Sequence, residues 1–452
     1  MSALGVFYET RTVGRIEVGA AGPTFVYDPG WLSTRGAFPL SIRMPLSALP
    51  FGPEVFSPWA TNLLPEGRAL TAIGARLGTS VEDFVSILKE IGRDTAGALS
   101  IGRRGTTQNV HWRPIGSATD LERIITELPA KPFLVGDEGV SMSLAGVQAK
   151  LGVAIDEHGR LCIPTAGSPS THILKPDSTD HLFGCVQNEA LCLTLARACG
   201  ITTPDVTTGK AGARTYVLVT RYDRLKQSDR WRRLHQEDFC QALGKPPSAK
   251  YEANQTGIKG PTLSDIFVLT RNAMTAADTL RLLDHVIFNI CVCNTDAHAK
   301  NYSLLISGQG FAMAPLYDVL CAAAWDGITR NLAQKIAGKN RGEHLKRRHW
   351  ERFATECGLN PTRTVARTKA LANLILARIE AAVAEVEAMP AGTHVMLPEF
   401  HKAIVTRCRA VLLGIEDHST GGDERTEAAA APLPSTNKPT HKPRKPRKVK
   451  KT

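Results

Sequence analysis

The stretch NTDAHAKNYSLL, residues 294–305, decides how the rest of the chain is interpreted. A strongly apolar, helix-like stretch precedes it, and the run YSLLIS at its end is typical of a strand. Residues 295–301 are therefore expected to form a short loop that is held rigidly from both sides. Because this loop gathers an aspartate, a histidine, a lysine and an asparagine within six positions, it is the first candidate for a catalytic site.

The spacing within the loop favours phosphoryl transfer. Asp296 and Asn301 stand five residues apart, which is the separation between the base and the metal-binding asparagine in the catalytic loop of protein kinases. After a predicted hairpin, Asp318 in MAPLYDVL supplies a second carboxylate. Oxygen ligands without a preformed cage suit Mg²⁺ that is carried on nucleotide phosphates.

The preceding strand-rich half offers the other parts of such a site. The loop SLAGVQAK, residues 143–150, has small residues that let backbone amides approach phosphates, although a single glycine falls short of a glycine-rich fingerprint. Lys175 in THILKPD lies on a predicted strand before a helix that contains Glu189, which is the order of the phosphate-binding lysine and the helix acid in kinases. A strand-end surface lysine is the alternative interpretation of Lys175. Residues 217–222 would then lead into a hinge that contacts the adenine.

Hydrophobic periodicity predicts an α+β fold in which a strand-rich half precedes a helix-rich half. In the first hundred residues, GRIEVG and TFVYDPGWL alternate around a turn at residues 20–23, as the strands of a hairpin do. Helical spacing follows from Leu63, with Ser80 as the expected N-cap of a second helix. A strand and a polar connector then indicate a domain boundary near residues 105–140. Further on, Asp278 is the expected N-cap of the apolar helix that leads into the candidate loop.

These patterns divide the chain into four segments. Residues 1–106 form a small α+β subdomain, 140–385 the main two-part domain, 386–420 a helical extension and 421–452 a tail. The end of this tail, NKPTHKPRKPRKVKKT, holds eight lysines and arginines and no acid, so most of the formal charge of +12 lies there. Low-complexity sequence of this kind cannot bury a core and is expected to be disordered. It favours a solubilising appendage over specific nucleic-acid recognition.

The composition is that of an ordinary folded protein. The chain is 43% hydrophobic and 22% charged, and no stretch has the features of a signal peptide or the roughly 18 apolar residues of a membrane span. A cytoplasmic location and no membrane partner are therefore expected. The ten cysteines contain no Cys-x-x-Cys pair, which indicates reduced, mostly buried thiols rather than a zinc site or a disulfide framework.

Seven segments follow one another along the chain: MSLAGVQAKLG, THILKPD, QNEALC, RYDR, RLHQEDFCQALG, NTDAHAKNYSLL and APLYDVL. In order and spacing they resemble the signature segments of the HipA family, the serine/threonine-kinase toxins of bacterial type II toxin–antitoxin systems. FVYDPGWL, PLSIRMPLS and NLLPEG likewise resemble the small domain that precedes the kinase in that family. The resemblance covers residues 3–385. It implies a protein-kinase-like two-part fold with a strand-rich N-terminal part and a helical C-terminal part.

The resemblance also implies roles for individual residues. It makes Asp296 the catalytic base and Asn301 and Asp318 the Mg²⁺ ligands, in agreement with the spacing argument. Ser143 matches a serine whose autophosphorylation switches the kinase off. Thr220 stands where well-studied members have an acid, so hinge contacts with ATP should come from backbone groups. The expected ATP contacts are Ser143, Ala145, Gly146, Lys150, Lys175, Val219, Thr220, Tyr222, His298, Lys300 and Asn301.

Some positions keep more than one interpretation. His298 is expected to brace the loop more than to transfer protons, and Lys300 either approaches the γ-phosphate or faces solvent. Arg221 and Asp223 are expected to form a local ion pair near the hinge. For Ser143 the alternative is a small strand residue whose hydroxyl bonds the backbone.

Partners and alternative classes follow from the same segments. The resemblance implies a helix-turn-helix antitoxin, operator DNA reached through it, and a translation-related protein substrate such as an aminoacyl-tRNA synthetase. A metal-dependent hydrolase could instead use Asp296, His298 and Asp318 as ligands, but it needs a further ligand and leaves Lys175 without a role. A non-catalytic repressor component would act only with a DNA-binding partner, which is a role compatible with the kinase. Stabilisation by Mg²⁺ with an ATP analogue would favour the kinase over both.

Overall fold

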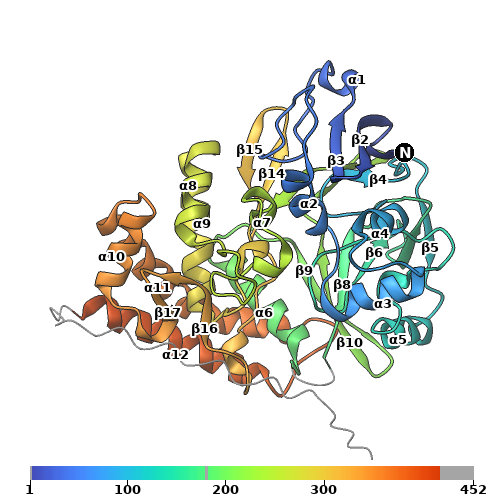
Figure 1. The fold of residues 1–452 in the computed structure, drawn as a ribbon. Coiled ribbons are helices and arrows are strands. Elements are labelled where there is room, and N and C mark those ends of the chain that lie inside the picture. The colour runs from blue at the N-terminus through green and yellow to red at the C-terminus, as the bar shows by residue number, and fades with distance from the viewer. Residues whose placement is uncertain (1–2, 179–181, 418–452) are drawn as a thin grey trace, which may run out of the picture. The chain divides into compact units, whose positions relative to one another are not determined.

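Strand β1 (Ala3–Tyr8) belongs to a small antiparallel sheet with the order β3-β2-β1-β4. The computed structural model describes residues 3–178 and 182–417, and Figure 1 shows this sheet together with the first helices. The β2–β3 hairpin turns where the sequence predicted it, with Gly19 paired to Gly22. The other elements of this N-terminal subdomain are β2 (Arg11–Gly19), β3 (Gly22–Tyr27), β4 (Leu99–Ile101), α1 (Pro29–Leu32), α2 (Pro53–Thr61), α3 (Gly67–Leu77) and α4 (Phe84–Ile91).

The second sheet has six strands in the order β5-β7-β6-β8-β10-β9, and its pairings are antiparallel. Helix α6 (Cys185–Ala198) is buried along nearly its whole length, because it is enclosed between β9, β10 and the long helix α11. The strands are β5 (His111–Pro114), β6 (Leu151–Ile155), β7 (Leu161–Thr165), β8 (His172–Pro176), β9 (Val206–Ala211) and β10 (Arg214–Thr220).

The predicted boundary region at residues 105–140 is more than a connector. It contains β5, which pairs with β7 at the edge of the six-stranded sheet. It also contains α5 (Ala118–Glu127), which packs on β9. A short, largely exposed edge strand has no apolar alternation, so its sequence resembles that of a loop.

Helices dominate the C-terminal half, as predicted, and the fold is α+β. In α9 (Ala276–Cys291) the predicted apolar stripe, including Leu282, Val286 and Ile290, is buried, and the helix ends directly before the candidate loop. The loop leads into β14 and β15, which form a sheet with the earlier strand β13 in the order β13-β14-β15. The other elements of this half are β11 (Arg224–Gln227), β12 (Arg230–Arg233), β13 (His235–Asp238), α7 (Phe239–Ala242), α8 (Leu263–Ala273), β14 (Ser303–Ser307), β15 (Gly310–Met313), β16 (Asn331–Ile336), β17 (Lys339–Arg341), α10 (Arg347–Glu356), α11 (Pro361–Glu387) and α12 (Leu397–Glu416).

Two helices begin at other residues than predicted. Asp83, not Ser80, caps α4, because the Asp83 carboxylate accepts a hydrogen bond from the amide of Ser86. Thr275, not Asp278, caps α9. The Thr275 hydroxyl accepts from the Asp278 amide while the Asp278 carboxylate accepts from the Thr275 amide, which is a reciprocal capping box. The acid that the sequence favours as the cap is thus the third residue of the helix.

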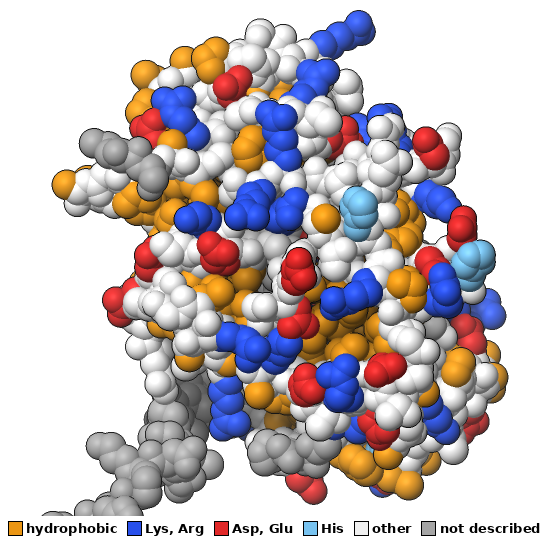
Figure 2. Space-filling view, turned by 90° about the vertical axis from the view of Figure 1, so that its right-hand side faces the viewer, with side chains coloured by type: hydrophobic (Ala, Val, Ile, Leu, Met, Phe, Trp, Pro, Cys, Tyr) orange, Lys and Arg blue, Asp and Glu red, His pale blue; other side chains and the backbone are white. Residues whose placement is uncertain are grey.

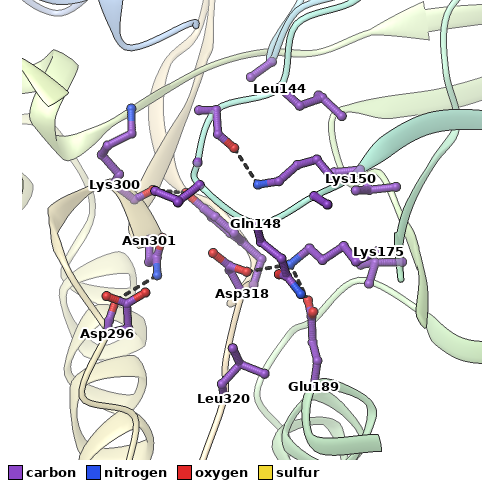
Figure 3. Close-up of a pocket in the computed structure, with 18 of the residues that line it drawn as sticks. Leu144, Gln148, Lys150, Lys175, Glu189, Asp296, Lys300, Asn301, Asp318 and Leu320 are labelled. Carbon is purple, nitrogen blue, oxygen red and sulfur yellow. Dashed lines mark hydrogen bonds and ion pairs between the residues drawn. The ribbon is translucent and has the colours of Figure 1, made fainter. Parts of the chain in front are cut away.

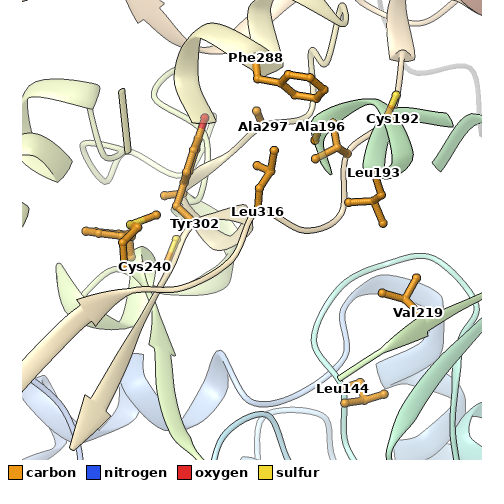
Figure 4. Close-up of a cluster of buried hydrophobic side chains, with 14 of the residues drawn as sticks. Leu144, Cys192, Leu193, Ala196, Val219, Cys240, Phe288, Ala297, Tyr302 and Leu316 are labelled. Atoms are coloured by element: carbon orange, nitrogen blue, oxygen red, sulfur yellow. The ribbon is translucent and has the colours of Figure 1, made fainter. Parts of the chain in front are cut away.

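The loop after α9 rests on a buried apolar cluster. Figure 4 shows Phe288 of α9 with Ala297, Tyr302 and Leu316, facing Leu193 of α6. Each of these five side chains is at most 8% exposed. Because such interiors are close-packed, the cluster holds the backbone of the loop in one place.

Buried charges fasten the N-terminal subdomain to the segment that follows β10 and contains β11 and β12. The Asp94 carboxylate pairs with the Arg224 guanidinium group at 2.8 Å and lies 3.6 Å from the guanidinium group of Arg233. The predicted Arg221–Asp223 ion pair is present at 2.7 Å, and the side chains of all five residues are at most 4% exposed. These five residues are called the Asp94 cluster below.

The C-terminal helices complete the described part of the chain. Helix α12 occupies most of the extension predicted for residues 386–420, and the tail at residues 421–452 lies outside the described residues. Among the described helices, none is long and apolar enough to cross a membrane. All ten cysteines are free thiols, and nine of them are buried, as predicted. Figure 2 shows basic and acidic side chains interspersed over one face rather than segregated.

Candidate active site

A cavity of about 670 Å³ lies between the six-stranded sheet and the helical half. Its walls come from residues 144–150, from β8 and β10, from the loop after α9 and from the segment around Asp318. These segments are far apart in the sequence, yet their polar side chains converge in Figure 3. A hollow of this size accommodates a small-molecule cofactor.

Lys175 connects the sheet to the helical half. From β8, its ammonium group reaches Glu189 Oε1 of α6 at 2.7 Å and Asp318 Oδ1 at 2.5 Å. The side chains of Lys175 and Glu189 are buried, whereas that of Asp318 is 32% exposed and lines the cavity. The structure thus brings together the lysine, the helix acid and the second carboxylate that the sequence predicted. These three residues are called the Lys175 cluster below.

The electrostatics of this cluster leave Asp318 charged. Burial opposes the charge on Lys175, but the carboxylates of Asp318 and Glu189 hold the pKa of the lysine above its ordinary value. Burial raises the pKa of Glu189, although Lys175 opposes this shift. For Asp318, burial is outweighed by Lys175 and Lys150, which hold the pKa of that carboxyl well below its usual range. An ionised carboxylate that faces a cavity is suited to bind a divalent cation.

Asp296 and Asn301 lie on the loop after α9, as predicted, and both line the cavity (Figure 3). The Asn301 side-chain amide donates to the main-chain carbonyl of Asp296 at 3.0 Å, which fixes the two residues relative to each other. Within the described part of the chain, Asn301 Oδ1 accepts no hydrogen bond, so it is available as a metal ligand. Loss of hydration raises the pKa of Asp296, and a hydrogen bond from Tyr251 opposes that shift.

His298 supports the loop. Its Nε2 lies 4.0 Å from Asp296 Oδ1, and its side chain is 7% exposed. Burial holds the pKa of His298 well below its ordinary value, so the ring is neutral. Its main-chain amide donates to the Asp296 carbonyl at 2.7 Å, and its carbonyl accepts from the Asn301 amide at 2.8 Å. These bonds close the turn and favour the bracing role over proton transfer.

Lys300 is engaged by other protein groups. Its ammonium group donates to Asn62 Oδ1 at 2.6 Å and to Asp238 Oδ2 at 3.2 Å. The side chain is 3% exposed, so the solvent-facing alternative is wrong. Although Lys300 lines the cavity, its charge is already paired, and this conformation does not support the predicted contact with the γ-phosphate.

Residues 144–150 form a loop against the cavity. Gly146 has a φ of 106°, a backbone conformation that residues with a Cβ rarely adopt, so the position favours glycine. Lys150 donates to the Ala145 carbonyl at 2.6 Å, and burial lowers the pKa of Lys150 to about 8. The Gly146 carbonyl accepts from the Glu66 amide at 3.2 Å, which ties the loop to the N-terminal subdomain. Ala145, Gly146 and Lys150 all line the cavity, as expected for ATP contacts.

Ser143 is fully buried and is not among the residues that line the cavity. Its hydroxyl donates to the Leu63 carbonyl at 2.7 Å, and its amide donates to the Asp94 carbonyl at 3.0 Å. It therefore anchors the 144–150 loop to the N-terminal subdomain. This is the alternative of a hydroxyl bonded to the backbone, and in this conformation Ser143 does not face the cavity in which its contact with ATP was predicted.

The end of β10 forms another wall of the cavity. Val219, Thr220 and Tyr222 line it, where the sequence predicted a hinge. Apolar side chains, including Leu144 and Leu320 in Figure 3, line the same cavity. An apolar slot beside a strand end is suited to a flat, partly apolar ligand such as a nucleotide base.

Four residues that shape the site belong to no chemical motif. Tyr251 donates its hydroxyl to Asp296 Oδ1 at 2.5 Å, and Lys250 pairs with Glu66 at 2.8 Å. Asn62 holds Lys300, as described above. Asn62 and Glu66 lie in the segment NLLPEG, so its resemblance to the family's small domain was the one available signal. Its contact with the catalytic loop depends on tertiary packing and could not be predicted from spacing.

The side chains present fit Mg²⁺ and a nucleotide. The Asp318 carboxylate and the available Asn301 oxygen are ligands that Mg²⁺ prefers, and Lys175 supplies a cation for phosphates. Among the described residues, no group of three or more His, Cys, Asp or Glu side chains could hold a metal ion. A hydrolase centre built on Asp296, His298 and Asp318 is therefore not supported, whereas an ion carried on phosphates needs fewer protein ligands.

Phosphoryl transfer from a nucleotide gives a role to Lys175, Glu189 and Asp318, which the other classes of protein leave without one. A hydrolase does not need the buried Lys175 paired to Glu189 of α6. A non-catalytic component does not need the partly exposed Asp318 that lines the cavity. The fold and the site together define the class of the protein as a protein-kinase-like phosphotransferase.

Comparisons with known proteins identify the family. The HipA-like C-terminal domain matches residues 142–386, and the HipA N-terminal domain matches residues 4–102. The chain is 37% identical over 367 residues to "Putative kinase Y4mE" of Sinorhizobium fredii, which covers 79% of this chain and 86% of that protein. It is 30% identical over 341 residues to the serine/threonine-protein kinase toxin HipA of Shewanella oneidensis, which covers 72% and 76%. The chain belongs to the HipA family and is a kinase.

A solved structure agrees with this assignment. It is the Shewanella oneidensis toxin–antitoxin complex of HipA, HipB and operator DNA, and it matches with a TM-score of 0.77 at 26% identity. The match covers 92% of this chain and 98% of the solved chain. The two-part kinase fold with a preceding small subdomain, expected from the sequence, is thereby confirmed.

Proposed function

We propose that this chain is a Mg²⁺- and ATP-dependent serine/threonine protein kinase that acts as the toxin of a type II toxin–antitoxin module. The observation that carries the proposal is the Lys175 cluster, in which one buried ammonium group joins Glu189 of α6 to the cavity-facing Asp318. In kinases this pairing positions the lysine for nucleotide phosphates. The Shewanella relative named a serine/threonine-protein kinase toxin supports the same activity.

In this proposal each of several cavity residues has a separate role in phosphoryl transfer. Bound Mg²⁺–ATP would supply the phosphoryl group and part of the charge neutralisation, with Asp318 and Asn301 as metal ligands. Lys175 would bind the phosphates, and the 144–150 loop would cover them and exclude water. Asp296 would accept the proton of the attacking hydroxyl. Positioning and charge neutralisation provide most of the rate enhancement in such sites.

A pair of variants tests this division. Asp296→Asn should abolish transfer of radiolabelled phosphate while Mg²⁺–ATP binding stays largely intact, since Lys175 and the metal ligands remain. Asp318→Ala should weaken Mg²⁺–ATP binding as well. Near-normal transfer by Asp296→Asn would show that the base is assigned wrongly. Radiolabelling of a bacterial lysate by the wild-type chain, followed by identification of the labelled protein, tests for a translation-related substrate such as an aminoacyl-tRNA synthetase.

The toxin role and its partners form the second part of the proposal. We infer that a helix-turn-helix antitoxin binds this chain and carries it to operator DNA, because the solved relative is described as a complex with HipB and operator DNA. Expression of the wild-type chain without antitoxin should arrest bacterial growth, and the Asp296→Asn variant should not. Normal growth with an active kinase, in a host that contains its substrate, would contradict the toxin role.

Autophosphorylation of Ser143 is the proposed means of regulation. A phosphate adds about −1.5 to −2 charge near neutral pH and cannot occupy a buried position without a cation, so the anchor to Leu63 would break. The 144–150 loop would then leave the cavity and ATP binding would weaken. Mass spectrometry after incubation with Mg²⁺–ATP should find phosphate at Ser143 in the wild type and none in Asp296→Asn. A fully active preparation with unmodified Ser143 would refute this regulation.

A further inference from the structure

Tyr251 faces the proposed catalytic base from the segment that follows α7. Its phenolic hydroxyl donates to Asp296 Oδ1 at 2.5 Å. The other oxygen of that carboxylate, Oδ2, accepts no hydrogen bond from the described residues, and the Asp296 side chain is 53% exposed. One carboxylate oxygen is therefore held in place while the other stays open to an incoming hydroxyl group.

The main chain on both sides of Tyr251 is fastened to the core of the site. The amide of Ala299, on the catalytic loop itself, donates to the Lys250 carbonyl at 3.2 Å. The amide of Glu252 donates to the Ala333 carbonyl of β16 at 3.0 Å. Tyr251 thus keeps a fixed position relative to Asp296.

The ring of Tyr251 is held as firmly as its backbone. Its edge-to-face contact with the buried His298 has a centroid separation of 5.0 Å, and the Lys250 ammonium lies 5.6 Å from the Tyr251 ring centroid. A Cβ at Gly260 would lie 1.9 Å from the Tyr251 carbonyl oxygen, so only glycine lets the chain pass there. Of these contacts, the one with His298 reaches the same short turn that carries Asp296.

We infer that Tyr251 is a positioning residue for phosphoryl transfer, whose hydroxyl holds Asp296 so that the open carboxylate oxygen faces the substrate hydroxyl. In this transfer the substrate oxygen forms a bond to the γ-phosphorus, the bond from that phosphorus to the ADP oxygen breaks, and the substrate proton passes to Asp296. Without the phenol, the carboxylate rotates freely and spends less time in the productive orientation, which slows proton transfer. The inference rests on the proposed role of Asp296.

The same contact also allows the opposite interpretation, in which Tyr251 is a plug, meaning that its hydroxyl blocks the Asp296 carboxylate against the substrate. A tyrosine hydroxyl on the base imitates a substrate hydroxyl, so Tyr251 would then have to leave before each turnover. The backbone bonds at Lys250 and Glu252 oppose such a departure. The two readings predict opposite changes in rate, because removing a plug accelerates turnover and removing a positioning group slows it.

Tyr251→Phe separates these readings in the full-length protein. We expect kcat to fall roughly 10- to 100-fold, the range that corresponds to losing a hydrogen bond to a charged group. The KM for ATP and the Kd of a non-hydrolysable ATP analogue with Mg²⁺, measured by calorimetry, should stay within about twofold. Tyr216→Phe is the matched control, since Tyr216 on β10 loses the same hydroxyl but does not line the cavity; its kcat should not change.

Each outcome is informative. An unchanged or increased kcat in Tyr251→Phe would overturn the inference, and so would an equal loss of kcat and of analogue affinity, which would indicate a loosened site. Asp296→Asn, measured in parallel, separates the role of Tyr251 from the role of Asp296 as the base. If it retains transfer, the proposed base is wrong; if it abolishes transfer while Tyr251→Phe is fully active, only the role of Tyr251 fails. Adding Tyr251→Phe to Asp296→Asn should leave the residual rate unchanged.

Discussion

The Asp94 cluster and the Lys175 cluster are both groups of buried charges, but they differ in how completely their carboxylates are paired. In the Asp94 cluster, both oxygens of Asp94 and of Asp223 accept hydrogen bonds from arginine or backbone donors. In the Lys175 cluster, a single ammonium group serves two carboxylates, and Glu189 Oε2 has no hydrogen-bond partner within the described structure. Every carboxylate oxygen of Asp94 and Asp223 is thus paired, whereas one oxygen of Glu189 is not. On the arginine side of the Asp94 cluster, Arg224 Nε and Arg233 Nε also lack a partner among the described residues.

This difference separates a structural role from a functional one. A buried cluster whose carboxylates are all paired resists rearrangement and joins the parts of the fold that contribute to it, here the N-terminal subdomain and the segment 221–233 that follows β10. An incompletely paired cluster that opens into a cavity retains capacity to bind a ligand. The partial exposure of Asp318, rather than the number of charges, marks the Lys175 cluster as the site.

Breaking the Asp94 cluster should have the largest effect on the stability of the molecule. Asp94→Asn leaves the buried guanidinium groups of Arg224 and Arg233 with one fewer counter-charge, so the free energy of unfolding should fall by about 3–5 kcal/mol. Urea denaturation followed by circular dichroism measures this loss. Glu189→Gln is the matched change in the Lys175 cluster and should cost only about 1 kcal/mol, because Lys175 keeps the Asp318 carboxylate as its counter-charge. Equal losses in the two variants would remove the distinction between the clusters.

Breaking the Lys175 cluster should affect phosphoryl transfer more than stability. Lys175→Met should lower phosphoryl transfer about 100-fold or more and weaken the binding of a Mg²⁺–ATP analogue, since the phosphates lose a preorganised cation. The free energy of unfolding should change by about 1–2 kcal/mol at most, because Glu189 can take up a proton and Asp318 can be hydrated from the cavity. Calorimetry with the analogue and urea denaturation measure the two quantities. A variant that unfolds but binds nucleotide normally would reverse the assignment.

The sequence predicts those parts of the site that stand at the ends of clearly periodic elements. Asp296 and Asn301 follow the apolar stripe of α9, and Lys175 lies on a strand before a helix, so chain order alone indicated a common site. Asp318 required only that the intervening segment be a hairpin, which β14 and β15 form. Local pattern and motif spacing were sufficient there because each side chain is positioned by its own element.

Contacts that depend on tertiary packing were beyond such reasoning. Tyr251 reaches Asp296 across 45 positions, and Asn62 reaches Lys300 across 238. The orientation of Ser143 and Lys300 toward the N-terminal subdomain follows from how that subdomain packs, which no periodicity records. These residues lie in turns and loops, where the sequence contains little information about direction.

A buried carboxyl group outside both clusters extends the comparison. Glu237 is 1% exposed, accepts a hydrogen bond from the Ile42 amide and forms no ion pair within the described residues. Burial raises the pKa of Glu237 from 4.5 to about 8. Between these two values the folded state holds a proton that the unfolded state has released, so stability contributed at this site falls as pH rises, by up to about 1.4 kcal/mol per pH unit.

Glu237→Gln should remove this pH dependence. Urea denaturation of the wild type and the variant between pH 5 and pH 8 gives two curves, and their difference isolates Glu237 from the other titrating groups. The variant should gain stability relative to the wild type toward pH 8 and gain little at pH 5. A constant difference across the range would mean that Glu237 has the same pKa in the folded and unfolded states, and that burial does not disfavour its charged form.

The smallest effect is expected where burial is absent. Arg123 and Glu127 pair across one turn of α5 at 3.2 Å, with side chains 61% and 42% exposed. Water and salt screen such a pair, the arginine precedes the acid, which is the weaker order, and Glu127 lies in the last turn, where the helix dipole disfavours a negative charge. Glu127→Gln should therefore change the free energy of unfolding by less than about 0.5 kcal/mol, and added salt should reduce even that difference. If this exposed pair contributed as much to the free energy of unfolding as Asp94 does, burial would not explain the strength of the Asp94 cluster. The pairing of the carboxylates could then no longer distinguish the Asp94 cluster from the Lys175 cluster.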